Sequence, residues 1–141
     1  MSAPDRSATA FTFQVRVYYE DTDAAGVVYY ANYLKFMERA RTEWLASLGF
    51  PLAAFEREHG VAFVVHRAEI DFIGAARLND RLDVTVEPVE RGASRLVAVQ
   101  EVRRGPTAIT KARVTLACVD TARWKPARIP KPLTHALEDL R

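Results

Sequence analysis

The chain has 141 residues, the size of one ordinary domain, and its 20 Lys and Arg nearly balance its 18 Asp and Glu. A net charge of +2 is too small for a general polyanion-binding surface, so nucleic acid is a poor candidate partner. The single cysteine, Cys118, has no partner for an internal disulfide and no zinc-ligand cluster around it. These features favour a protein of a reducing compartment, the cytoplasm.

The N-terminal residues 1–10 are small and polar, and we expect a loose leader there. They lack the basic and apolar regions of a secretory signal, and no stretch of the chain approaches the ~20 apolar residues that span a bilayer. We therefore expect no integral membrane segment. A peripheral position at the inner membrane would need a partner or an amphipathic face.

The first half of the chain changes its hydrophobic period once. Apolar and polar residues alternate over 11–19, which predicts a strand with one buried face. Helical spacing follows over 30–48, and Gly49 ends that helix. A short second helix is expected over 51–58, closed by Gly60. The apolar stripe of the long helix comprises Tyr30, Tyr33, Leu34, Met37, Trp44, Leu45 and Leu48.

The second half is rich in Val, Ile and Leu and predicts strands separated by turns. The expected strands are 61–73, 82–87, 94–104 and 107–119. One helix then packs on an antiparallel sheet of about five strands, an α+β fold. A single helix covers only one face of such a sheet, so we expect the chain to oligomerise. The tail 121–141 is basic and contains prolines, which predicts an extended arm.

The strand-to-helix segment 18–33 is where chemistry is expected. It contains all five tyrosines and places Glu20, Asp21 and Asp23 within four positions, so repulsion and partial burial would raise the pKa of at least one carboxyl group. Such a group can act as general base or nucleophile. The first turn of the following helix offers free N–H groups to an oxyanion, and Gly26 allows a tight turn and close approach of a substrate.

Two other interpretations of this segment remain. Asp21, Thr22 and Asp23 form a polar turn and helix cap in many proteins. A metal site is less favoured, because no histidine lies nearby and Mg²⁺ or Ca²⁺ requires more oxygen ligands. The pattern by itself indicates attack on a carbonyl without requiring it.

Several runs carry a resemblance to a known family. They are Arg16-Val17-Tyr18-Tyr19-Glu20-Asp21-Thr22-Asp23-Ala24-Ala25-Gly26-Val27-Val28-Tyr29, then Ala31-Asn32-Tyr33 and Glu38-Arg39-Ala40-Arg41-Thr42-Glu43. Similarity continues through 61–65 and into the tail at 125–131. The chain resembles the hotdog-fold acyl-CoA thioesterases, most closely the YbgC type associated with the Tol-Pal system, with the hydroxybenzoyl-CoA thioesterases as cousins.

This resemblance implies one hotdog domain over 1–141, in which a curved antiparallel sheet wraps around one long helix. It implies homodimers joined edge to edge, often paired into homotetramers, with active sites at the dimer interface. The substrate is acyl-CoA, with acyl carrier protein as another possible carrier, and no metal or redox cofactor is expected. The cellular setting would be lipid metabolism.

The family motif also assigns roles to residues. Asp23 matches the catalytic carboxylate, which either attacks the thioester carbonyl or deprotonates the attacking water. The backbone N–H of Tyr30 matches the oxyanion donor. Tyr30 stands where YbgC-type members often carry His, so no His-dependent step is expected, and its ring either shapes the acyl pocket or anchors the helix. Asp21 is expected to hold the loop.

Further residues are candidates for contact with the substrate. Tyr29, Tyr33 and His66 are expected near the acyl or pantetheine portion, His66 because it shares a strand face with Ala68, Ile70 and Phe72. The turn 91–95 resembles one that contacts the nucleotide of coenzyme A, which nominates Arg91 and Ser94. An ordinary solvated turn and a core histidine are the alternatives.

Two further functions are compatible with the same fold. The first is a non-catalytic scaffold of the cell-envelope machinery that recognises an acyl thioester or acyl carrier protein. The second is a hotdog dehydratase or hydratase, which is disfavoured because such enzymes usually pair a histidine with a carboxylate and 18–33 contains none.

Overall fold

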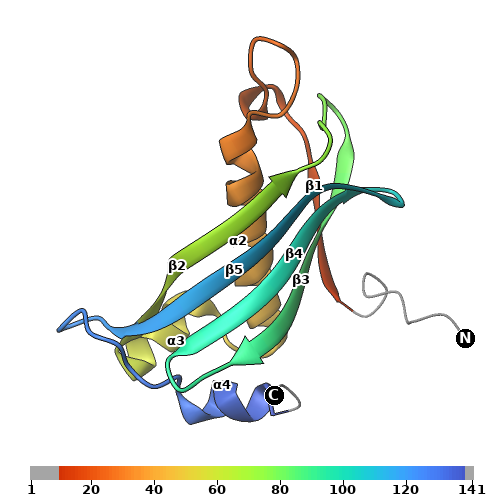
Figure 1. The fold of residues 1–141 in the computed structure, drawn as a ribbon. Helices are drawn as coiled ribbons and strands as arrows, with labels where there is room; N and C mark the ends of the chain where they lie inside the picture. The colour runs from red at the N-terminus through yellow and green to blue at the C-terminus, as the bar shows by residue number, and fades with distance from the viewer. Residues whose placement is uncertain (1–9, 139–141) are drawn as a thin grey trace, which may run out of the picture.

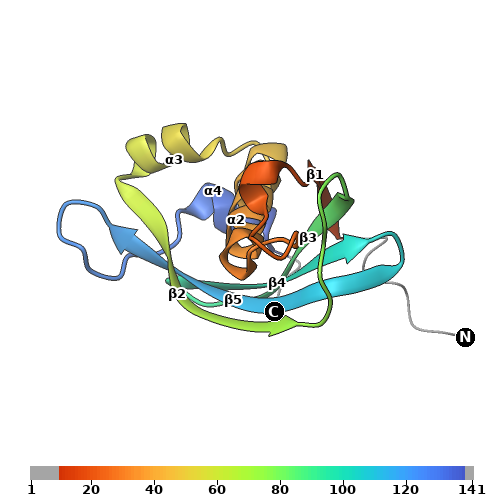
Figure 2. The same cartoon turned by 90° about the horizontal axis from the view of Figure 1, so that it is seen from above.

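A computed structural model describes residues 10–138. Its elements are β1 (Phe11–Arg16), η1 (Tyr19–Asp21), α2 (Tyr30–Ser47), α3 (Leu52–His59), β2 (Val61–Phe72), β3 (Arg81–Arg91), β4 (Arg95–Arg104), β5 (Thr107–Asp120) and α4 (Lys131–Ala136). The five strands form one antiparallel sheet in the order β1-β3-β4-β5-β2. The sheet curves around α2 (Figures 1 and 2), which is the α+β hotdog architecture expected from the sequence.

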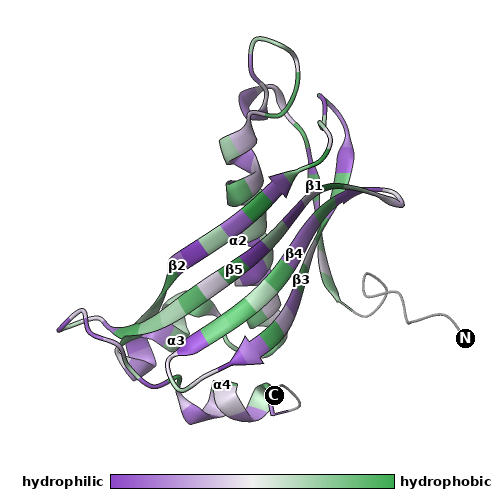
Figure 3. Cartoon of the chain, in the orientation of Figure 1, coloured by the Kyte–Doolittle hydropathy of each residue, from purple (hydrophilic) through white to green (hydrophobic). Residues whose placement is uncertain are grey.

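The hydrophobic core lies between α2 and the concave face of the sheet. Period-2 alternation in the strands sends every second side chain inward, and α2 buries one stripe against them. Figure 3 shows the resulting mixture of apolar and polar positions along the strands. Core residues include Phe36, Met37 and Ala40 from α2, and Leu82, Val84, Leu96, Val102, Val114 and Cys118 from the sheet.

A buried polar side chain, Gln100, links α2 to the sheet within this core. Gln100 on β4 is 1% exposed and donates hydrogen bonds to the carbonyls of Met37 (3.1 Å) and Thr85 (3.3 Å). Its Oε1 accepts a hydrogen bond from Arg41 Nη1 at 2.9 Å. Burial lowers the pKa of the Arg41 guanidinium. Because buried polar groups need specific partners, the hydrogen bonds of Gln100 fix the position of α2 along the sheet.

Two expectations about the first half of the chain are wrong in detail. The strand expected over 11–19 ends at Arg16, because the chain turns into η1. Within α2, Tyr30 and Leu34 are 60% and 43% exposed, although both belong to the expected apolar stripe, and Leu48 lies just beyond the helix. The apolar surface of α2 is therefore wider than the face that the sheet of one chain covers.

The expected extended arm over 121–141 is also wrong. Residues 131–136 form α4, with Pro132 in its first turn where a missing N–H costs nothing. Leu133 is fully buried and Leu137 is 4% exposed, so α4 packs against the core. The leader 1–10 lies almost entirely outside the described residues.

The sheet leaves one long edge unpaired within the described chain. β2 is a terminal strand of the sheet and bonds only to β5. Exposed apolar side chains lie along it and just beyond it: Val64, Val65, Phe72 and Ile73. A long edge strand with apolar side chains is a surface that proteins ordinarily cover.

Candidate active site

The loop between η1 and α2 is a small hairpin. Thr22 pairs with Val28, the N–H of Asp23 donates to the Val27 carbonyl (2.9 Å), and the N–H of Gly26 donates to the Asp23 carbonyl (3.0 Å). Gly26 has φ +80°, a left-handed conformation that closes a turn of this type. The sequence therefore folds this loop into a defined turn with Asp23 at its start.

Asp21 lies at the base of the hairpin. It is 6% exposed, and its Oδ2 accepts the N–H of Tyr18 at 2.9 Å. Its Oδ1 accepts a hydrogen bond from Asn32 Nδ2 at 2.8 Å, and its carbonyl accepts the N–H of Tyr29 at 2.9 Å. Asp21 thus joins η1 to the start of α2 through two contacts, with Tyr29 and Asn32, and its third contact, with Tyr18, lies at the start of η1.

Asn32 was not singled out in the sequence. It is 7% exposed and lies in the first turn of α2. An asparagine 11 residues after an aspartate predicts a hydrogen bond between the two side chains only when the hairpin between them is known. The long separation within the chain explains why pattern reasoning did not find the pair.

Asp23 lies on the open surface of the single chain. Its side chain is exposed, and Oδ1 accepts a hydrogen bond from the N–H of Ala25 at 2.9 Å. That bond fixes the direction of the carboxylate, while the other oxygen has no hydrogen-bond partner within the described residues. One chain alone therefore presents Asp23 without enclosing it.

The start of α2 lies immediately beside this hairpin in sequence. Tyr30 is the first residue of the helix, so its N–H has no acceptor within α2. The Tyr29 and Tyr30 rings lie 4.8 Å apart, and the Tyr30 ring meets the edge of Phe72 on β2 at 6.0 Å. Hydrogen bonding with Tyr30 raises the pKa of Tyr29. The free amide is thus framed by exposed aromatic rings.

Tyr33 is a core residue rather than an open surface residue. It is 2% exposed, and its hydroxyl accepts the N–H of Ala76 at 3.0 Å. Burial raises the pKa of Tyr33, and the Ala76 bond opposes that shift. The carbonyl of Ala76 accepts the N–H of Val28 at 2.8 Å, so Tyr33 anchors the loop that supports the hairpin.

His66 does not continue the inward row of β2. A β-bulge between Val65 and Arg67 interrupts the alternation, so His66 is not held on the face of Ala68 and Ile70 by strand geometry. Its side chain is exposed. Because one extra residue interrupts the alternation at this point, the register of β2 does not assign His66 to the face of Ala68, Ile70 and Phe72.

Arg91 and Ser94 lie at the opposite end of the sheet from the hairpin. Arg91 ends β3, and its buried Nε has no hydrogen-bond partner within residues 10–138. The carbonyls of Ala93 and Ser94 accept N–H groups from Ile129 and Cys118, each at 2.8 Å. These bonds bring the turn against the basic tail, which contributes Lys125, Arg128 and Lys131.

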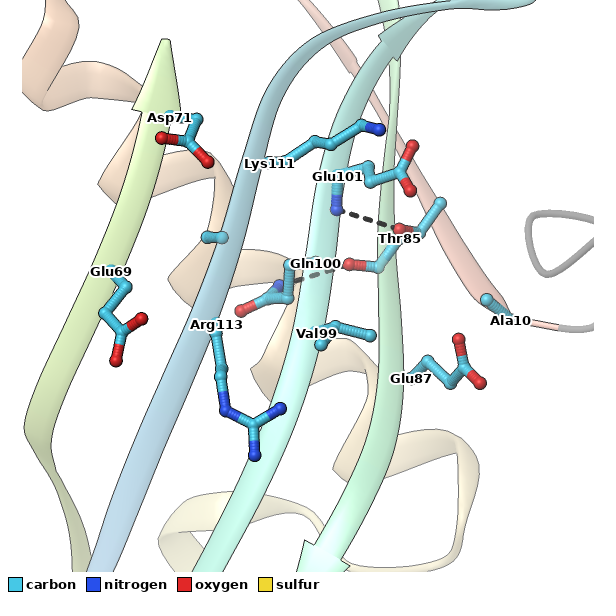
Figure 4. Close-up of a pocket in the computed structure, with 11 residues that line it drawn as sticks. Ala10, Glu69, Asp71, Thr85, Glu87, Val99, Gln100, Glu101, Lys111 and Arg113 are labelled. Carbon is cyan, nitrogen blue, oxygen red and sulfur yellow. Dashed lines mark hydrogen bonds between the residues drawn. The ribbon is translucent and has the colours of Figure 1, made fainter.

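A pocket of about 310 Å³ lies on the outer face of the sheet (Figure 4). None of the expected site residues lines it. Carboxylates alternate with cations along its walls: Glu69, Asp71, Glu87 and Glu101 beside Lys111 and Arg113. Its balance of charge is unfavourable for an anionic substrate, and we interpret it as a solvated sheet face.

A second groove, of about 260 Å³, lies between α2 and β2. Leu45, Leu52, Phe63, Val65 and Leu116 form its apolar wall, and Glu38, Arg41 and Thr42 its polar one. Val65 and Phe63 come from the unpaired edge strand. An apolar group that entered between the helix and this edge would therefore be shielded from water.

Over residues 10–138, no group of three or more His, Cys, Asp and Glu side chains is arranged to hold a metal ion. Across the same range, no helix has the length and apolar character needed to cross a bilayer.

Comparison with known proteins agrees with this architecture. The model of the Thioesterase-like superfamily matches residues 17–137. The acyl-CoA thioesterase YbgC of Haemophilus influenzae is 45% identical over 131 residues, covering 93% of this chain and 96% of the relative. The acyl-CoA thioester hydrolase YbgC of Escherichia coli O6:H1 is 42% identical over 128 residues, covering 90% and 95%.

A solved structure agrees as well. The 1,4-dihydroxy-2-naphthoyl-CoA thioesterase Slr0204 from Synechocystis superposes with a TM-score of 0.84 at 30% identity, covering 93% of this chain and 97% of that one. The fold and the hairpin before α2 thus define a hotdog enzyme that hydrolyses thioesters. Within that class, the chain belongs to the Thioesterase-like superfamily and is of the YbgC type.

Proposed function

We propose that this protein hydrolyses acyl-CoA to a free carboxylic acid and coenzyme A, with Asp23 as the reacting carboxylate. The observation that supports this most is that the hairpin carrying Asp23 leads directly into α2, where the N–H of the first residue, Tyr30, has no acceptor within the helix. The YbgC relatives, 42–45% identical over most of the chain, are named for acyl-CoA thioester hydrolysis.

In this proposal the thioester oxygen accepts the N–H of Tyr30, and the positive end of α2 stabilises the charge that develops there. Asp23 acts in one of two ways. Its carboxylate bonds to the acyl carbon and expels the thiolate of coenzyme A, and water then cleaves the mixed anhydride. Otherwise it takes the proton of a water that attacks the acyl carbon, and that proton passes to the departing thiolate.

The exposure of Asp23 in one chain supports a site that a second copy completes. We propose a homodimer joined through the β2 edge, with the homotetramer as a pair of such dimers. In it, the exposed aromatic rings of Tyr29, Tyr30 and Phe72 would face the partner instead of water.

We also propose that the turn 91–95 and the tail bind the phosphates of coenzyme A. The hydrogen bond from the Ile129 N–H to the Ala93 carbonyl joins the turn to the tail, and the arginine and lysine side chains of both segments suit phosphate recognition. Within one chain this surface lies far from Asp23. On β5, Thr110 pairs with Phe72 near the start of α2, and Cys118 bonds to Ser94 in the turn. These two positions are about 26 Å apart at ~3.3 Å per residue. A site shared between subunits would reconcile this separation with one substrate.

The test is Asp23→Asn, assayed by release of free thiol from short, long and aromatic acyl-CoAs and from an acyl carrier protein thioester. We expect kcat to fall about 100-fold or more with fold and oligomeric state intact. Glu20→Gln is the matched control, since it removes a neighbouring exposed carboxylate, and it should keep most of the activity.

The outcomes separate the candidates. Wild-type turnover that survives Asp23→Asn would refute the role of Asp23, and acyl-thioester binding without turnover would favour the scaffold function. A single turnover in isotopically labelled water identifies the nucleophilic role of Asp23 when water attacks the carboxyl carbon of Asp23 in the anhydride. Only the anhydride route places solvent oxygen in the Asp23 carboxyl group, where mass spectrometry of the peptide detects it.

A further inference from the structure

The hydrogen bond between Asp21 and Asn32 occupies a distinctive position relative to the chemistry. Asp21 lies two residues before Asp23, and Asn32 lies two residues after Tyr30. The pair therefore bridges the two arms that carry the proposed carboxylate and the proposed oxyanion donor. Both side chains are more than nine-tenths buried, and the bond between them is 2.8 Å long.

From this geometry we infer that Asn32 is a positioning residue, which with Asp21 sets the distance between the Asp23 carboxylate and the Tyr30 amide. The inference rests on the proposed function. Asn32 touches neither the substrate nor the reacting atoms; it acts through the backbone on which they are carried.

The first argument is that the Asp21–Asn32 bond joins the outgoing arm to α2 itself, whereas the backbone bonds of the hairpin join that arm to Val27 and Val28 on the returning arm. The loop containing Ala76 holds Val28 and Tyr33, which are on the returning arm and the helix. The outgoing arm is joined to the helix start through Asp21, by its carbonyl to Tyr29 and by its carboxylate to Asn32. A displacement of about 1 Å between reacting groups can cost on the order of 100-fold in rate.

The second argument is the chemistry of the pair. Asp21 is a buried carboxylate that accepts hydrogen bonds from two neutral donors, the Tyr18 N–H and the Asn32 amide, and no ion pair involves it within the described residues. Burying such a charge without a cation is unfavourable for stability. Because a carboxylate only accepts hydrogen bonds, the Asn32 amide must present its nitrogen to Asp21. This requirement fixes the orientation of the Asn32 amide group.

The pair can be reversed without loss of hydrogen bonds, which makes the inference testable. In Asp21→Asn/Asn32→Asp, the new amide at position 21 accepts the Tyr18 N–H through its oxygen and donates through its nitrogen to the new carboxylate at position 32. Asn32→Asp alone places two carboxylates in contact, which repel each other. Asp21→Asn alone keeps a hydrogen bond if the Asn32 amide turns over.

The experiment measures kcat and KM for four variants: Asn32→Asp, Asp21→Asn, the double exchange, and Gln14→Glu. The last makes the same amide-to-carboxylate change on the exposed face of β1. At neutral pH we expect Asn32→Asp to lower kcat about 30-fold or more with KM within about 3-fold, Asp21→Asn to be mild, and the double exchange to recover kcat to within about 3-fold of wild type. Circular dichroism and gel filtration identify the folded fraction, and rates are expressed per folded protein.

The double exchange decides the matter. A double exchange no faster than Asn32→Asp, or an Asn32→Asp variant that keeps wild-type kcat, would overturn the inference. If Asp23→Asn has already abolished turnover, either result refutes the positioning role and leaves the proposed function standing. If Asp23→Asn has no effect, the proposed function fails first.

Discussion

Substitutions of Gly26 separate the effect of the turn on stability from the effect of a side chain on substrate approach. It has φ +80°, and a Cβ built on it would meet no atom within 4 Å. Gly26→Ala therefore causes no clash in the free protein. Its cost is conformational, about 1–2 kcal/mol for an L-residue in the left-handed region. Asparagine adopts that region more readily, so Gly26→Asn should cost less.

Activity is expected to follow a different order. If the thioester passes close to the backbone between Asp23 and the Tyr30 amide, a side chain at position 26 obstructs it, and the larger asparagine obstructs it more. Stability should then decrease in the order Gly, Asn, Ala, while kcat/KM decreases in the order Gly, Ala, Asn.

Thermal unfolding at fixed protein concentration and thiol release measure the two orders. A loss of 1–2 kcal/mol corresponds to a fall in Tm of about 2–8 °C for a domain of this size. If kcat/KM follows the same order as Tm, Gly26 serves only the turn, and the reasoning about substrate approach is refuted.

Three other predictions test the structure more widely. Leu133→Ala should lower the free energy of unfolding by about 2–5 kcal/mol in denaturant titrations, because Leu133 is fully buried, and exposed Lys131→Ala should change it by less than about 0.5; equal effects would mean that α4 does not pack on the core. Burial raises the pKa of Cys118 to about 11 from 9.0, so the folded state holds this proton more tightly than the unfolded chain. That stabilisation is present below pH 9 and is lost as the pH rises toward 11, and Cys118→Ala should flatten the alkaline decline in urea titrations; an unchanged slope would contradict this. Val65→Lys with Ile73→Lys should shift sedimentation velocity profiles to a smaller species, whereas Thr12→Lys on the β1 edge should not, and an unaltered oligomer would exclude the β2 edge as the interface.

Much of the architecture could be predicted from local patterns. The Val-, Ile- and Leu-rich runs 82–87 and 107–119 and the helical spacing in 30–48 are properties of short segments, and each produced the expected element. Gly60 ends α3 with φ +64°, as its position suggested. These features depend on backbone and side-chain preferences that act over a few residues.

The site was predicted less evenly. The segment from Arg16 to Tyr33 predicted the turn around Gly26 and the start of α2, because its residues are contiguous. The position of His66 depended on a bulge in β2, and a bulge arises from pairing with β5 rather than from the sequence of β2 alone. The role of Tyr33 depended on Ala76, which lies 43 residues away.

The sequence by itself determined the order of the five strands and of α2 and α3, the turn that carries Asp23, and the expectation that the chain oligomerises. Only the tertiary structure decided that Asn32 meets Asp21, that Gln100 links Arg41 to the sheet, and that α4 docks through Leu133. The physical reason is the range of the interactions along the chain. Local backbone and side-chain preferences select the helices and strands. Buried contacts between distant residues depend on how those elements pack, and a short segment alone does not specify them.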